Sequence, residues 1–177
     1  ILPLLLKDLP SEDDEATSLV DNGELEGKSV IIADYDTDQV AEISSICESW
    51  GMEVATAGDG SSVLKKLISR NYDVLLTSLS LPGMDGYETT SRIRASKKEK
   101  KRVMPIIALT DDSSRHLFKK VRLAGMNGFV RKPVNNKDLR DALIALLVNQ
   151  KTMINPEETF DDEGFLLSDN RPPGLNI

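Results

Sequence analysis

Short apolar runs alternate with longer amphipathic stretches through the middle of the chain. The apolar runs are typical of strands that are buried on both faces of a parallel sheet. In the amphipathic stretches, the apolar residues recur at a spacing that would line one face of a helix. The pattern predicts strands at 30–33, 53–57, 74–76, 105–109 and 127–131, and helices at 39–50, 61–69, 87–95, from Asp112 or Ser113 to about 123, and 135–148.

This alternation of strands and helices predicts an α/β domain with right-handed crossovers and a parallel sheet. In open sheets of this kind, the functional site lies outside the carboxyl ends of the strands. Polar residues follow four of the predicted strands, at 34–36, 77–80, 110–112 and 131–133. The chemistry of the protein is therefore expected at these four places.

Size and composition are those of one soluble domain with tails: the chain has 177 residues, 40% of them hydrophobic and 5% aromatic. The single cysteine, Cys47, excludes an internal disulfide and fits a reducing, cytoplasmic setting. The apolar start at 1–6 is interrupted by Pro3, is too short to span a bilayer, and lacks the basic flank of a signal peptide. Because the chain begins with Ile1, we expect it to be a piece of a longer protein.

Charge is unevenly distributed. Residues 1–27 contain eight acids and one base, and residues 151–177 contain six acids and two bases, whereas the middle has 15 acids and 19 bases. We therefore predict an acidic linker at 1–27, a folded domain at 28–149, and an acidic tail or linker at 150–177. Acidic arms argue against nucleic acid as the main partner. The basic cluster at 97–102 is interpreted as a solvated loop, with a docking patch as the alternative, and His116 as a surface residue.

Three stretches resemble the receiver domains of response regulators and hybrid histidine kinases, and the resemblance covers about 28–148. The stretches are Tyr72-Asp-Val-Leu-Leu-Thr-Ser-Leu-Ser-Leu-Pro-Gly-Met-Asp-Gly86, Pro105-Ile-Ile-Ala-Leu-Thr110 and Ala124-Gly-Met-Asn-Gly-Phe-Val-Arg-Lys-Pro133. The resemblance implies a flavodoxin-like (CheY-like) fold, with a five-stranded parallel sheet in order 2-1-3-4-5 and helices on both faces.

The same resemblance implies where the receiver site would lie. In the family, two adjacent acids follow the first strand, and the third strand ends in the aspartate that accepts the phosphoryl group. A threonine or serine ends the fourth strand, and a lysine before proline ends the fifth. These positions hold Asp34 and Tyr35, Ser78, Thr110, and Lys132. Two of the three carboxylates are therefore missing.

This loss predicts a degenerate pocket without catalytic residues. An acyl phosphate requires a carboxylate nucleophile, and Mg²⁺ binding usually requires one or two carboxylates. We therefore expect no metal and no cofactor, with Asp36 as a partial substitute if Mg²⁺ binding survives. Lys132 is expected to pair with Asp34, at about 0–1 kcal/mol if the pair is solvated. Phe129 lies at the position of the family's switch aromatic, and the resemblance implies a cis bond before Pro133.

The expected function is that of a phosphorylation-independent pseudo-receiver, which regulates an attached or partner histidine kinase by protein–protein contact. Its parent chain could be a histidine kinase, since residues 1–6 resemble the last strand of a kinase ATP-binding domain. Two alternatives stay open: an atypical receiver that takes phosphate on a non-standard residue, and a pseudo-receiver that senses a small molecule. The expected partners are histidine kinase domains and the chain's own acidic linker or tail, with a homodimer left open. No nucleic acid or membrane contact is expected.

Overall fold

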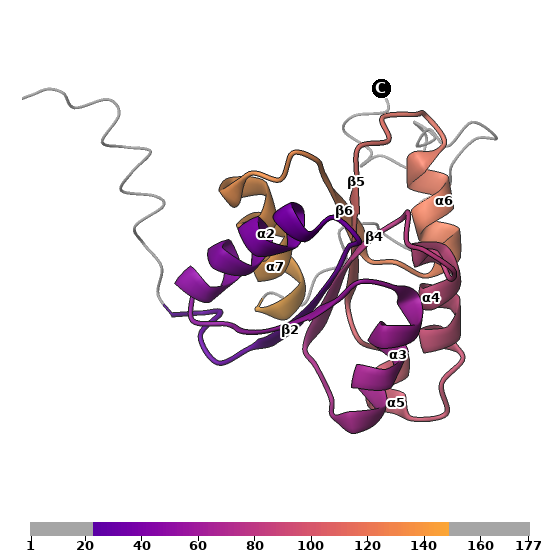
Figure 1. The fold of residues 1–177 in the computed structure, drawn as a ribbon, viewed down its shortest axis with the longest axis horizontal. Helices are drawn as coiled ribbons and strands as arrows, with labels where there is room; N and C mark the ends of the chain where they lie inside the picture. The colour runs from indigo at the N-terminus through magenta and orange to yellow at the C-terminus, as the bar shows by residue number, and fades with distance from the viewer. Residues whose placement is uncertain (1–22, 149–177) are drawn as a thin grey trace, which may run out of the picture.

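Five parallel strands form the centre of the protein in the computed structural model, which describes residues 23–148 (Figure 1). Their order across the sheet is β3-β2-β4-β5-β6, so the predicted order 2-1-3-4-5 is confirmed. The strands are β2 (Ser29–Ala33), β3 (Glu53–Ala57), β4 (Val74–Ser78), β5 (Ile106–Thr110) and β6 (Gly128–Arg131). All residues of β2, β4 and β5 are buried, which explains the run of apolar residues in each of them.

Helices cover both faces of this sheet (Figure 1). They are α2 (Thr37–Ser49), α3 (Gly60–Ser69), α4 (Gly86–Arg94), α5 (Glu99–Arg102), α6 (Leu117–Ala124) and α7 (Asn136–Leu147). In β2, Val30 and Ile32 pack in the core on the side of α2 and α7, whereas Ile31 and Ala33 pack on the side of α3 and α6. This alternation follows from the two-residue period of a strand. No helix within 23–148 is long and apolar enough to cross a membrane.

The start of α6 differs from the sequence prediction. The helix begins at Leu117, with His116 as an N-cap that makes no side-chain hydrogen bond, so the predicted cap at Asp112 or Ser113 is wrong. The Asp112 carboxylate instead accepts a hydrogen bond from the backbone N–H of Ser114 at 2.7 Å. Asp side chains stabilise both turns and helix starts in this way, and here the turn prevails.

The basic cluster at 97–102 also differs from the predicted solvated loop. Its last four residues form the single-turn helix α5. Although most of the cluster is exposed, the Lys101 ammonium donates to the backbone carbonyl of Leu67 at the end of α3. A lysine stem can lie along the protein surface while its charged end finds an acceptor. Lys101 therefore ties α5 to α3.

A turn at 23–27 belongs to the folded domain. Leu25 is fully buried in the core that β2 shares with α2 and α7. Glu24 pairs with Arg140 of α7 at 3.7 Å, and the Gly27 N–H donates to the Gly51 carbonyl at 2.9 Å. The prediction that residues 1–27 all lie outside the core is therefore wrong for Leu25. A single leucine among acidic residues carries no periodic signal.

Gly86, at the start of α4, allows the chain to approach the end of β4 closely. A Cβ at this position would lie 2.4 Å from the Ser78 carbonyl oxygen and 3.0 Å from the Leu79 Cα, both of them backbone atoms. Backbone cannot yield as a flexible side chain can, so Gly86→Ala should lower the free energy of unfolding by about 1–3 kcal/mol. Urea denaturation measures the change. Gly58→Ala is the matched control, since its Cβ would meet nothing within 4 Å and Gly58 has no positive φ; equal losses in the two variants would contradict the steric argument.

Candidate functional site

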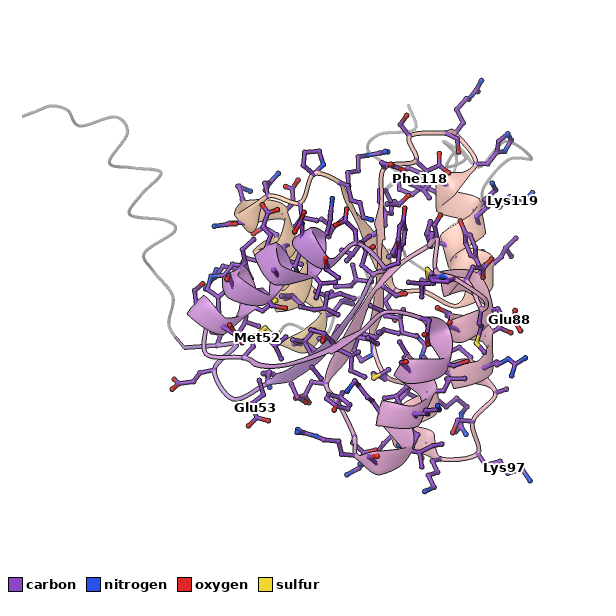
Figure 2. All side chains as sticks on the ribbon, viewed as in Figure 1. Met52, Glu53, Glu88, Lys97, Phe118 and Lys119 are labelled. Atoms are coloured by element: carbon purple, nitrogen blue, oxygen red, sulfur yellow. The ribbon has the colours of Figure 1, made fainter. Side chains whose placement is uncertain are left out.

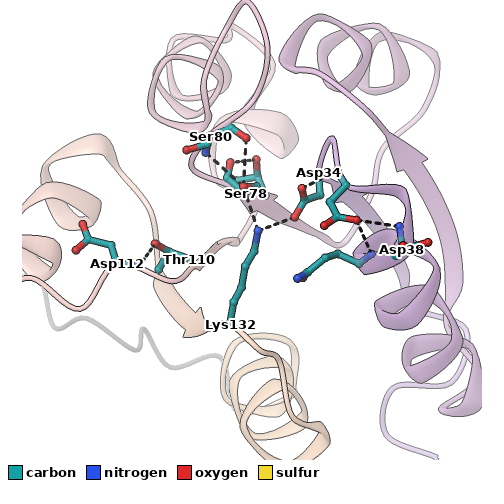
Figure 3. Close-up of polar contacts among 10 residues, drawn as sticks. Asp34, Asp38, Ser78, Ser80, Thr110, Asp112 and Lys132 are labelled. Carbon is teal, nitrogen blue, oxygen red and sulfur yellow. Dashed lines mark hydrogen bonds and ion pairs between the residues drawn. The ribbon is translucent and has the colours of Figure 1, made fainter.

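The carboxyl edge of the sheet brings together Asp34, Ser78 and Lys132 (Figure 3). Asp34 follows β2, Ser78 ends β4, and Lys132 follows β6, so the four crossovers between β2 and β6 place residues that lie far apart in the sequence at one edge. The Lys132 Nζ lies 2.8 Å from the Asp34 Oδ2 and 3.4 Å from the Ser78 Oγ. The predicted ion pair between Asp34 and Lys132 is confirmed. The Lys132–Pro133 peptide bond is cis.

Burial makes this ion pair different from a surface salt bridge. The Asp34 side chain is 0% exposed and that of Lys132 is 16% exposed. The other carboxylate oxygen of Asp34 accepts a hydrogen bond from the backbone N–H of Asp36 at 3.0 Å. The condition of a solvated pair, on which the small expected energy depended, is therefore not met. Removing one member of such a pair leaves a charge in a region of low dielectric constant.

Tyr35 and Asp36 do not join this cluster. Tyr35 is 63% exposed, although the resemblance places it where the family has its second acid. Asp36 is the N-cap of α2, and its Oδ1 accepts hydrogen bonds from the backbone N–H groups of Asp38 and Gln39. A carboxylate in this position stabilises the helix start. The suggested use of Asp36 as a substitute metal ligand therefore competes with its capping role.

The two hydroxyl groups of the candidate site bond to backbone. The Ser78 Oγ donates to the Ser80 carbonyl and accepts from the Ser80 N–H, both at 3.3 Å. The Thr110 Oγ1 accepts from the Asp112 N–H at 2.9 Å, and Figure 3 shows Thr110 and Asp112 apart from the Lys132 cluster. Thr110 therefore holds the loop between β5 and α6. Within 23–148, the only side chain that hydrogen-bonds to the Ser78 Oγ is the Lys132 ammonium, which is a donor and not a base.

Phe129 lies between an aromatic ring and a cation. The Phe118 ring packs against it edge to face, with centroids 5.0 Å apart and planes at 76°. The Arg131 guanidinium lies 5.3 Å from the Phe129 centroid and donates to the Asp112 carbonyl at 2.7 Å. Both contacts stabilise one position of the ring. Phe118 was not predicted to take part in the site, and 131–133 was expected to carry chemistry without a contact between Arg131 and Phe129, although Arg131 follows Phe129 by two residues and so shares its face of β6.

The side chains at this edge do not fit Mg²⁺, the ion that the resemblance implies. Mg²⁺ demands octahedral oxygen ligands and is usually held by one or two carboxylates. Here Asp34 is already paired with Lys132, Ser78 is neutral, and Tyr35 is largely exposed. Across the part of the chain that the structure describes, no three His, Cys, Asp or Glu side chains are grouped in a way that could hold a metal ion.

A cavity of about 390 Å³ lies at the opposite, amino edge of the sheet. It is lined by Ser29, Asn71, Tyr72, Asp73, Lys100, Val103, Met104 and Pro105. The carboxylate of Asp73 accepts hydrogen bonds from both the backbone N–H and the hydroxyl of Ser29. This cavity is therefore separate from the cluster around Lys132 and does not support a ligand at the strand carboxyl ends.

This chain is similar to one domain family and to several known proteins. The model of the response regulator receiver domain matches residues 30–144. The CAI-1 autoinducer sensor kinase/phosphatase CqsS of Vibrio cholerae is 40% identical over 99 residues, which are 56% of this chain and 14% of that protein. The chemotaxis protein CheY of Pseudomonas aeruginosa is 30% identical over 117 residues, which are 66% of this chain and 92% of that protein.

Solved structures resemble the fold as well. The receiver domain of a Pseudomonas aeruginosa sensor histidine kinase, solved with a magnesium ion coordinated in its active site cleft, is 28% identical with a TM-score of 0.63, covering 68% of this chain and 98% of that one. The chemotaxis response regulator CheY4 of Vibrio cholerae is 26% identical with a TM-score of 0.64, covering 68% of this chain and 99% of that one. By contrast, the chain spans only 14% and 18% of the sensor proteins CqsS and RpfC that it matches.

Proposed function

This chain belongs to the response regulator receiver domain family, and from that premise we propose that it is a phosphorylation-independent module of two-component signalling. It regulates a histidine kinase, in the same or another chain, by protein–protein contact. The observation that carries the proposal is the pairing of Asp34 with Lys132 beside Ser78, at the end of β4 where the resemblance places the phosphoacceptor.

The chemistry of the cluster supports this proposal. Phosphoryl transfer to a receiver forms an acyl phosphate, which requires a carboxylate at the end of β4. Ser78 is 3% exposed, and its hydroxyl is engaged with the backbone of Ser80. The Lys132 ammonium lies 3.4 Å from the same hydroxyl and 2.8 Å from the Asp34 carboxylate, so its positive charge would repel a metal ion bound between them. We therefore propose that neither Mg²⁺ nor a phosphoryl group is used.

The surroundings of Phe129 support a single default state. A ligand or modification shifts a conformational equilibrium only if it interacts differently with the two states. Without phosphorylation that difference is lost, and Phe118 and Arg131 hold the aromatic ring in its present position. The module should then bind its partner constitutively.

The proposal extends to the parent protein of this module and to its compartment, and both are inferred from the relatives. Several of the relatives are sensor kinases, and receiver domains of such proteins exchange signals with histidine kinases or phosphotransfer partners. We propose that the parent chain is a hybrid histidine kinase and that this segment lies in the cytoplasm.

Titration with Mg²⁺ and beryllofluoride, an analogue of the phosphoryl group, tests the proposal. The amide spectrum of residues 34–36, 78–80 and 110–112 should stay unchanged, because two of the three carboxylates that would hold these ligands are missing. Incubation with a small phosphate donor should likewise leave the intact mass unchanged. The double variant Tyr35→Asp with Ser78→Asp is the positive control and should gain saturable shifts.

Two results would contradict the proposal. Saturable shifts at these residues in the natural chain would show that the pocket still binds the metal and the phosphoryl analogue. A stable phosphoryl group on Ser78 would favour the alternative of an atypical phosphorylatable receiver.

A further inference from the structure

The residues of α6 and those just before it are rich in positive charge. From 113 to 125 the chain contains no acidic residue and four cations, which are Arg115, Lys119, Lys120 and Arg122. Asp112 lies just before this stretch, and on neighbouring α4 Glu88 is paired with Arg92 at 2.8 Å. Such a surface attracts acidic partners.

The same surface exposes large apolar side chains. Phe118 is 40% exposed although it packs on Phe129, and Leu123 is 69% exposed. Leu117 and Val121 are fully buried and define the inner side of α6. On a helix of 3.6 residues per turn, the outer side is then shared by Phe118, Lys119, Lys120, Arg122 and Leu123. Figure 2 shows Phe118 and Lys119 on α6.

A segment of complementary composition follows α7 in the same chain. Residues 156–167 read Pro-Glu-Glu-Thr-Phe-Asp-Asp-Glu-Gly-Phe-Leu-Leu, with five acids, no base and four large apolar residues. The segment lies outside the described residues, and seven residues separate it from Val148. Both α6 and α7 pack on β6, the edge strand of the sheet. A covalently attached partner acts at an effective concentration of about millimolar.

We propose that residues 156–167 dock on the outer face of α6. Their carboxylates pair with Lys119, Lys120 and Arg122, and their phenylalanine and leucine side chains cover Phe118 and Leu123. This intramolecular contact does not depend on the loss of phosphorylation. Where a partner also uses α6, the segment competes with it and sets a threshold for binding.

A spin label attached to the full chain tests the contact directly. Burial, with a smaller contribution from the Glu48 charge, raises the pKa of the Cys47 thiol to about 12, so a new cysteine is labelled in preference to it. A label at Ser168→Cys should broaden the amide signals of Lys119, Lys120 and Leu123. The matched control is Ser11→Cys in the acidic segment at the other end, and its label should leave these signals sharp.

Charge reversal tests the electrostatic part. Asp161→Lys with Asp162→Lys and Glu163→Lys should abolish the broadening from position 168, and so should raising the salt from about 0.05 M to about 0.5 M, because exposed charges are then screened. Reversal of Asp13, Asp14 and Glu15 gives the same change of net charge and should leave it intact.

Three outcomes would overturn the proposal. Absence of broadening on α6 from position 168 would show that the segment does not dock there. Broadening from position 11 alone would identify the other acidic segment as the occupant. Broadening only in a mixture of labelled and isotope-enriched molecules, and not within one molecule, would identify a second copy of the chain.

Discussion

Replacing Lys132 by methionine should lower the free energy of unfolding by about 3–5 kcal/mol, the usual loss when one member of a buried ion pair is removed. The reason is the environment of Asp34, whose side chain is completely buried. Without the ammonium 2.8 Å away, the carboxylate would keep only its hydrogen bond from the backbone N–H of Asp36 among the described residues. Urea denaturation at neutral pH, followed by circular dichroism, measures the change.

Two further variants separate charge from packing. Asp34→Asn together with Lys132→Met removes both charges, so the double variant should recover most of the stability that the single change loses. Lys137→Met breaks the largely exposed pair with Asp141 on α7 and should change stability little. If Lys132→Met proved no more harmful than Lys137→Met, Lys132 would not be needed to balance Asp34.

Replacing Arg94 by alanine should be nearly as harmful, with a loss of about 3 kcal/mol, because four acceptors, three of them in partly buried contacts, would lose a charged donor at once. Arg94 ends α4, and its guanidinium donates to the backbone carbonyls of Gly125, Arg102 and Met104 and to the side-chain oxygen of Asn127, at 2.7 to 2.9 Å. Burial lowers the pKa of this guanidinium. Asn127 in turn accepts from the Ile106 N–H at the start of β5.

The fork shape of the Arg94 guanidinium, and not only its charge, should contribute to the free energy of unfolding. Arg94→Lys should lose most of the same stability, since one ammonium cannot reach four acceptors on two separate segments. The neighbouring Arg92 offers a matched control, because it makes one exposed ion pair with Glu88, and Arg92→Ala should change stability little. Full stability in Arg94→Lys would mean that charge alone explains the contribution of Arg94.

Strands were the most predictable part of this fold, because burial on both faces dictates their composition. The predicted strands 30–33 and 74–76 lie within the fully buried strands β2 and β4. Helix starts were less predictable where one residue type serves two purposes. Asp36, Asp59 and Asp85 each cap a helix, whereas Asp112 closes a turn that delays α6. Only the surrounding packing distinguishes these cases.

The candidate site was predictable in its residues but not in its environment. The resemblance located Asp34, Ser78 and Lys132, and opposite charges at one sheet edge predicted their contact. Complete burial of Asp34 depends on how neighbouring loops close, which no local pattern encodes. Arg94 was missed for a related reason: three of its four acceptors are backbone carbonyls, and a carbonyl leaves no trace in the amino-acid sequence.

The turn at 23–27 has a mechanical consequence. Leu25 packs in the same core as residues of α7, and Glu24 is paired with Arg140 of that helix. The turn at 23–27 is therefore in contact with the last helix of the domain before β2 begins. Torque applied from upstream would therefore reach α7 without first passing through the sheet. Conversely, a rotation of α7 would move the turn at 23–27 with it. The contacts of Leu25 and Glu24 thus couple the start of the domain mechanically to its last helix.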